Sequence, residues 1–177
     1  VIFVSDVLVE IEFEGLVPTD FSWILGSILF VAIWMRVYTR STFLTALCLF
    51  YILFSVMVGM FVYKLILNIL FFDFIHLLVV FLILGIGADG VFVVVDAWKQ
   101  SKEFEKDEFN RLAYTYNRSA ATVFNTSFTT MFAFAVTGLS ALVPISTFGI
   151  FAAICIGVNY VFILTVVSVC ATSYILL

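Results

Sequence analysis

Five long apolar stretches, separated by short polar breaks, constrain this chain more than any other feature of its sequence. They comprise residues 21–37, 42–63, 75–97, 120–143 and 147–177. A hydrocarbon core about 30 Å thick requires about 20 helical residues, and each stretch approaches or exceeds that length. The sequence therefore predicts an all-α membrane protein whose five transmembrane helices form one bundle.

The composition argues against a soluble fold. Hydrophobic residues make up 64% of the 177 residues and charged residues only 11%, so polar side chains are too few to cover a surface in water. We therefore expect lipid to cover most of the molecule. Three scattered cysteines, Cys48, Cys155 and Cys170, predict small buried residues rather than a disulfide framework or a metal site. We expect no cofactor and no nucleic-acid partner.

The N-terminal segment has a different pattern. Residues 2–14 alternate imperfectly between apolar and polar side chains, which predicts a short strand with one solvated face. Because a lone strand is not stable in water, its partners should belong to a preceding extracellular domain. We expect residues 1–20 to be the end of that domain and a hinge, residues 21–177 to be the membrane bundle, and the whole chain to be part of a longer protein.

The distribution of basic residues predicts the orientation in the membrane. None precedes the first apolar stretch, Arg36 and Arg40 follow it, and Lys64 alone follows the second. Five more lie in the connector of residues 99–119, and cytoplasmic connectors carry the excess of Lys and Arg. We therefore expect an extracellular or lumenal N-terminus, a cytoplasmic connector and a cytoplasmic C-terminus. Separately from this charge pattern, the plasma membrane is the expected location.

The connector itself has a helical pattern. Its apolar residues recur at the spacing of a helix face: Phe109, Leu112, Ala113 and Tyr116. Two interpretations remain open, a short helix lying in the headgroup plane and an ordinary solvated linker helix.

A glycine-rich segment interrupts the third apolar stretch. Gly85, Gly87 and Gly90 satisfy the G-x-G-x-x-G dinucleotide pattern, but that pattern requires a soluble βαβ unit. Inside a membrane helix, Gly85 and Gly87 instead permit a neighbouring helix to approach, or permit the helix to deform. The pattern therefore predicts a helix contact rather than a nucleotide site.

An acidic residue lies within the same segment. Asp89 is about eight residues from the cytoplasmic end of its stretch, which is roughly 12 Å of helix. An ionised acid at such depth costs on the order of 3 kcal/mol, and intramembrane acids usually mark ion or proton pathways. Asp89 is therefore the first functional candidate. Asp96 lies seven residues on, near the boundary, where pairing with a nearby base is the favoured interpretation.

Other polar residues are secondary candidates. His76 lies near the outer boundary, where we expect it to be solvated. Small and hydroxyl residues form two stripes at helical spacing, which predict tight helix packing: Thr126, Thr130, Ala133, Thr137 and Ser140 in one, and Gly149, Ala153 and Gly157 in the other. Asn125 and Asn159 should face the bundle interior because amides are costly in lipid. No nucleophile, base and orienting group lie together, so no enzyme is predicted.

Several segments together resemble a known family. The segment LGIGADGVFV (84–93), followed by VDAWKQS (95–101), is similar to the fourth transmembrane helix of Dispatched proteins, which are relatives of Patched in the resistance-nodulation-division superfamily. Three further pieces resemble the same family in order. They are TRS-x-FLT (39–45), TSFTT with AF (126–134), which includes Thr129 and Thr130, and FGIF with NY (148–160).

This resemblance implies that the five stretches are helices two to six of one half of a twelve-helix transporter, the unit called the sterol-sensing domain. Such proteins move or release sterols or lipid-modified cargo, using a cation gradient coupled through acidic residues within the membrane. The implied partners are membrane lipid or sterol, a lipid-modified protein cargo, and a second transporter half or other membrane subunits. The family usually has two adjacent acids, and here only Asp89 is present because Gly90 occupies the second position. A non-transporting lipid-binding or structural membrane subunit is the alternative.

Overall fold

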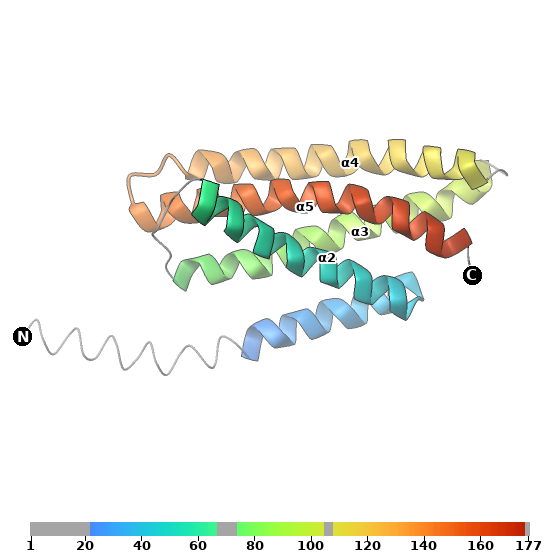
Figure 1. The fold of residues 1–177 in the computed structure, drawn as a ribbon, viewed down its shortest axis with the longest axis horizontal. Coiled ribbons are helices and arrows are strands. Elements are labelled where there is room, and N and C mark those ends of the chain that lie inside the picture. The colour runs from blue at the N-terminus through green and yellow to red at the C-terminus, as the bar shows by residue number, and fades with distance from the viewer. Residues whose placement is uncertain (1–21, 67–73, 105–107, 176–177) are drawn as a thin grey trace, which may run out of the picture.

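The computed structural model describes the backbone of residues 22–66, 74–104 and 108–175 and the side chains of residues 22–65, 75–102 and 109–165. Nearly all of these residues are helical (Figure 1). The elements are a first helix at Ser22–Thr39, α2 at Thr42–Phe61, a π-helical turn at Val62–Ile66, a 3-10 turn at Phe74–Leu77, α3 at Leu78–Phe104, α4 at Glu108–Thr137 and α5 at Val143–Ile175. The strand expected within residues 2–14 lies outside the described residues.

Four of the helices are long and apolar enough to cross a membrane. They are Ser22–Thr39, Thr42–Leu65, Ile75–Lys102 and Val143–Thr165, with mean hydropathies of 1.4, 2.3, 2.7 and 2.1. α4 is not among them, although it has 30 residues. Its predicted membrane segment contains Asn125 and several threonines, whose polarity lowers the hydropathy. The described residues therefore confirm an all-α membrane protein but not the count of five spans.

A tight turn joins the first helix to α2. Arg40 has a φ of 57°, which reverses the chain after Thr39, and Ser41 caps α2 by accepting a hydrogen bond from the amide of Leu44 at 3.5 Å. The hydroxyl of Thr39 donates to the carbonyl of Met35 at 2.8 Å and lies 2.9 Å from the hydroxyl of Thr45. These bonds satisfy the polar groups of the turn and fix the two helices as an antiparallel pair.

α5 is the helix around which the bundle packs. It contacts α2, α3 and α4, and its contact with α4 is the most extensive of all helix pairs; Figure 1 shows α4 lying along α5. Glycine makes these contacts close. A Cβ on Gly149 would lie 2.7 Å from the carbonyl oxygen of Phe134 on α4, and a Cβ on Gly157 would lie 3.4 Å from the sulfur of Met131. The predicted helix contact at the α5 stripe is therefore confirmed.

The corresponding prediction for α4 is wrong at two positions. Thr126 and Ala133 are exposed, whereas Val123 and Ser127 are buried on the adjacent face. The threonine hydroxyls of α4 donate to backbone carbonyls of the preceding turn, as Thr130 does to the carbonyl of Thr126 at 2.7 Å. Since these hydroxyls are already hydrogen-bonded, they need no neighbouring helix.

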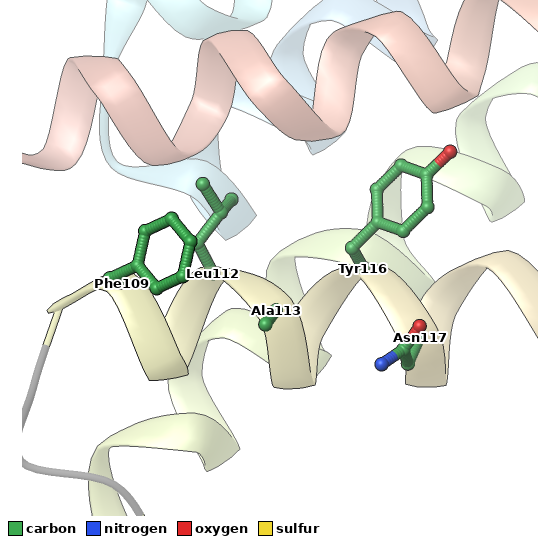
Figure 2. A pocket seen from close by; sticks show the side chains of 5 residues that line it. All are labelled: Phe109, Leu112, Ala113, Tyr116 and Asn117. Carbon is green, nitrogen blue, oxygen red and sulfur yellow. The ribbon is translucent and has the colours of Figure 1, made fainter.

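The connector also differs from the expectation. α3 continues to Phe104 and α4 begins at Glu108, so residues 109–116 are the first turns of a long helix and not a separate short one. Three small hydroxyl residues are buried at this end of the bundle, and each donates to a carbonyl of its own helix: Ser101, Thr115 and Ser119. Figure 2 shows the first turns of α4, where Phe109, Leu112, Ala113, Tyr116 and Asn117 line an open hollow of about 280 Å³.

His76 is not solvated, contrary to the expectation from sequence. Only 1% of its surface is exposed. Its ring lies 5.9 Å from that of Tyr63 and 5.6 Å from that of Phe151, and these two rings are 5.3 Å apart. An aromatic cluster at the ends of α2 and α3 therefore buries this histidine, because its ring offers apolar faces as well as polar nitrogens.

Candidate functional site

α3 has an exposed face, and that face carries the two acids whose side chains the structure describes on this helix. Gly85, Asp89 and Asp96 are all exposed and are spaced by four and seven residues, which places them on one side of a helix. The opposite side is buried, with Val91 and Val94 each only 1% exposed. The rotation of α3 is therefore fixed by its valines, and this rotation turns Asp89 away from the apolar core.

Asp89 lines a small pocket between α3 and α4. The pocket has a volume of about 140 Å³ and is lined from α3 by Ile86, Asp89, Gly90 and Val93 and from α4 by Val123, Thr126, Ser127 and Thr130. One carboxylate and three hydroxyls thus converge in an otherwise apolar wall. Sequence analysis had singled out Asp89, Thr126 and Thr130, but not as neighbours.

The hydroxyls on α4 are oriented by their own helix. Thr126 donates to the carbonyl of Val123 at 3.1 Å, and Thr130 donates to the carbonyl of Thr126 at 2.7 Å. Their hydrogens are therefore engaged, and their oxygen lone pairs remain as acceptors. A carboxylate beside hydroxyl oxygens is a set of hard oxygen ligands, which suits a small cation or a proton on the carboxylate.

Ser127 is the polar residue of the pocket that sequence analysis did not single out. It is 5% exposed and lies next to Thr126 and one turn from Thr130. Its position four residues after the buried Val123 and four before the packed Met131 could have indicated an inward-facing side chain.

The motif glycines have different surroundings. A Cβ on Gly87 would lie 2.8 Å from the side chain of Ile52 on α2, and a Cβ on Gly90 would collide with the side chain of Ile163 on α5. The helix contact predicted at Gly87 is therefore confirmed. Gly85 has no such neighbour, because nothing described lies within 4 Å of its Cβ position.

The secondary candidates do not gather at Asp89. Asp96 accepts a hydrogen bond from Gln100 at 2.7 Å, while the neighbouring base, Lys99, donates to the carbonyl of Tyr38 at 3.1 Å and covers its ring at 4.1 Å. The base nearest in sequence is thus held by the first helix, and the described contacts do not bear out the expected pairing of Asp96.

The two asparagines have opposite fates. Asn125 is exposed, so the expectation that it faces the interior is wrong. The hydroxyl of Thr129, which is also exposed, donates to the backbone carbonyl of Asn125 at 2.9 Å. Asn159 is fully buried, as expected. Neither of its amide atoms has a hydrogen-bond partner within the described part of the chain. Asn159 does not line the Asp89 pocket.

Long apolar helices around one carboxylate among hydroxyls define a multi-pass membrane protein, and comparison with known proteins specifies its family. The family model described as Patched SSD, where SSD denotes the sterol-sensing domain, matches residues 21–172. The chain therefore belongs to the Patched family and is a Dispatched- and Patched-like sterol-sensing domain.

Two relatives from different organisms support this assignment. The chain is 37% identical over 142 residues to mouse protein dispatched homolog 1, which is 78% of the chain and 9% of that protein. It is 30% identical over 180 residues to Drosophila melanogaster protein dispatched, which is 86% of the chain and 14% of that protein. The chain thus spans less than a sixth of the length of the relatives that it matches.

Proposed function

We propose that this chain is part of a Dispatched-like membrane transporter that moves or releases sterol or lipid-modified cargo by using a cation gradient. The observation that carries the proposal is the pocket of about 140 Å³ that is lined by Asp89 on α3 and by Thr126, Ser127 and Thr130 on α4. The family membership supports the transport of lipid-like cargo, and the pocket supports coupling to a cation.

Asp89 would act as the coupling group. An ionised carboxylate at this depth is unfavourable unless a cation or a proton neutralises it, so its occupancy depends on the gradient across the membrane. The pocket walls belong to two different helices, and a bound cation would therefore favour the arrangement of α3 and α4 that brings these oxygens together. This difference in affinity between two arrangements is what lets an ion gradient drive movement.

The exposed polar face requires a partner within the membrane. Gly85, Asp89 and Asp96 on α3 and Asn125 and Thr129 on α4 are exposed, and lipid is a poor environment for acids and amides. We propose that a second transporter half covers these exposed polar residues and supplies further oxygen ligands to the cation at Asp89.

We propose that α4 also crosses the membrane, which would bring the number of spans to five. Its 30 residues rise about 45 Å at 1.5 Å per residue, which is enough to cross a bilayer, and it packs along α5, an apolar helix of 33 residues. Its threonine hydroxyls are bonded to its own backbone, which lowers their cost in the membrane. The excess of basic residues in 99–119 supports a cytoplasmic connector and an extracellular or lumenal N-terminus.

One observation favours the alternative, a non-transporting lipid-binding or structural membrane subunit. The resemblance to Dispatched proteins implies a second acid at the position of Gly90, and here the side chain of Ile163 fills the space that a Cβ would need. A packing contact between α3 and α5 therefore occupies the place where the resemblance implies a second acid. Under this alternative Asp89 contributes nothing to coupling.

The substitution Asp89→Asn tests the choice between the two, because the amide keeps the shape of the side chain and loses its charge. The measurement is cargo export by the full-length protein in membranes with and without an imposed sodium or proton gradient. Transport predicts that Asp89→Asn removes the gradient-dependent part of export, whereas Asp96→Asn, which changes an acid outside the pocket, retains it. Equal export by wild type and Asp89→Asn would refute the coupling role.

A further inference from the structure

A second hollow lies between the first helix and α2, near the turn that joins them. It has a volume of about 390 Å³ and is lined by Ala32, Ile33, Arg36, Val37, Thr42, Thr45, Ala46 and Leu49. It is separate from the Asp89 pocket, which is built from α3 and α4. We call this hollow the Arg36 groove.

The walls of the groove are apolar except at one end. The hydroxyl of Thr45 donates to the carbonyl of Ser41 at 2.8 Å and lies 2.9 Å from the hydroxyl of Thr39, so it offers little to a ligand. Ile33, Val37 and Ala46 are exposed along the groove. The guanidinium of Arg36 is therefore the charged group of an otherwise apolar groove.

The charge at this end has no partner in its own helices. No acidic residue occurs between residues 21 and 72, whereas Arg36 and Arg40 lie one turn apart. The acid Asp96 is on α3 and already accepts a hydrogen bond from Gln100. Tyr38 packs on Phe92 of α3, and two residues along a helix rotate a side chain by about 200°, which places Arg36 on the opposite side. An anion that neutralises Arg36 must therefore come from outside the two helices.

We propose that the Arg36 groove binds an anionic glycerophospholipid, with the phosphate on Arg36 and Arg40 and one acyl chain along Ile33, Val37 and Leu49. Guanidinium groups bind phosphate oxygens in a bidentate manner, and basic pockets between membrane helices recognise anionic headgroups. A sterol hydroxyl would give the two arginines no charge to neutralise, so the charges favour the phospholipid. The orientation proposed above places the Arg36 groove in the cytoplasmic leaflet of the membrane. Only this choice of leaflet, and not the binding itself, rests on the proposed function.

The test is titration of the purified full-length protein with phosphatidylserine or phosphatidylcholine, followed by native mass spectrometry. We expect Arg36→Gln to weaken phosphatidylserine binding at the strongest site about fivefold. Phosphatidylcholine binding should weaken less, because its choline ammonium already offsets the charge of the phosphate that both lipids carry. The matched control is Lys102→Gln, which removes an exposed cation outside the groove and should leave both affinities unchanged. Soluble glycerophosphoserine, which lacks the acyl chains, should bind much more weakly than the lipid.

A second variant tests the groove itself. Ala46 is exposed, so Ala46→Trp should fold and fill the groove, which should weaken phosphatidylserine binding, whereas the exposed Ala121→Trp should not. Equal losses in Arg36→Gln and Lys102→Gln would overturn the proposal, as would unchanged binding in Ala46→Trp. Displacement of the phospholipid by cholesterol from wild type but not from Ala46→Trp would identify a sterol groove instead. Because binding is measured without a gradient, none of these outcomes depends on coupling at Asp89.

Discussion

On α5, Gly149 lies so close to α4 that a Cβ would meet the backbone of Phe134 and Gly138, whereas on α4 Thr126 and Ala133 are exposed. Both helices carry small residues at helical spacing, and the sequence alone gave the two stripes the same meaning. At Thr126 the difference lies in the hydrogen bonds of its hydroxyl to its own helix. A glycine can only offer space, but a threonine that bonds its own backbone can also face a polar interior. On α5, small residues therefore form the close contact between α4 and α5, which we call the seam. On α4, small residues line the Asp89 pocket.

The largest effect should come from filling the seam at its closest point. Gly149→Leu places a side chain against backbone atoms, which cannot rotate away, so we expect a loss of about 3 kcal/mol or more, at or above the upper end for overpacking. The measurement is the melting temperature of the full-length protein in detergent. Ala133→Leu, at an exposed position of α4, is the control and should melt like wild type. A Gly149→Leu variant with the wild-type melting temperature would mean that α4 and α5 are not packed at this residue.

Gly157→Leu should have a smaller effect of the same sign. The nearest atom to its Cβ position is the sulfur of Met131, at 3.4 Å, and methionine is flexible enough to move. We expect a loss of about 1 kcal/mol, at the lower end for overpacking, in the same melting experiment. A loss equal to that of Gly149→Leu would show that the seam is uniformly tight along α5.

The sequence predicted the helical spans because apolar length is a direct requirement of the bilayer. The expected stretch beginning at residue 42, for example, begins where α2 begins, at Thr42. It did not predict that α4 starts as early as Glu108, because charged residues lower hydropathy without breaking a helix. It also placed Asn125 inward, since the pattern of α4 is polar on more than one side and does not reveal which side packs.

The candidate site was predictable only in part. Asp89 stands out by its cost in lipid, a property of one residue in its own helix. Its neighbours Ser127 and Thr130 come from α4, and helix adjacency is not encoded in hydropathy. The buried end of the connector follows the same rule: Arg111 lies over the ring of Trp98 at 4.5 Å, a contact between two helices that spacing within either helix could not show.

Asn159 offers a prediction of opposite sign. Its side chain is fully buried and its amide atoms lack partners within the described residues, which leaves a desolvation cost that no hydrogen bond offsets. Replacing it with Leu, which has a similar volume, should raise stability by about 1 kcal/mol. The same change at the exposed Asn125 is the control. A lower melting temperature in Asn159→Leu would indicate that the amide is hydrogen-bonded in the full-length protein.

The smallest effect on stability should come from a substitution in the wall of the Asp89 pocket. Because such a substitution should barely change packing, any effect on export reports on function. Thr126→Val keeps the shape of the side chain and removes an exposed hydroxyl that bonds only within α4. We therefore expect a change in stability within about 0.5 kcal/mol, typical of a surface position. If the pocket oxygens hold a cation with Asp89, the same variant should require a higher sodium concentration or a steeper gradient for half-maximal export, while Thr129→Val, whose residue does not line the pocket, should not. An unchanged ion dependence in Thr126→Val would remove its hydroxyl from the ligand set and leave the carboxylate of Asp89 to act without it.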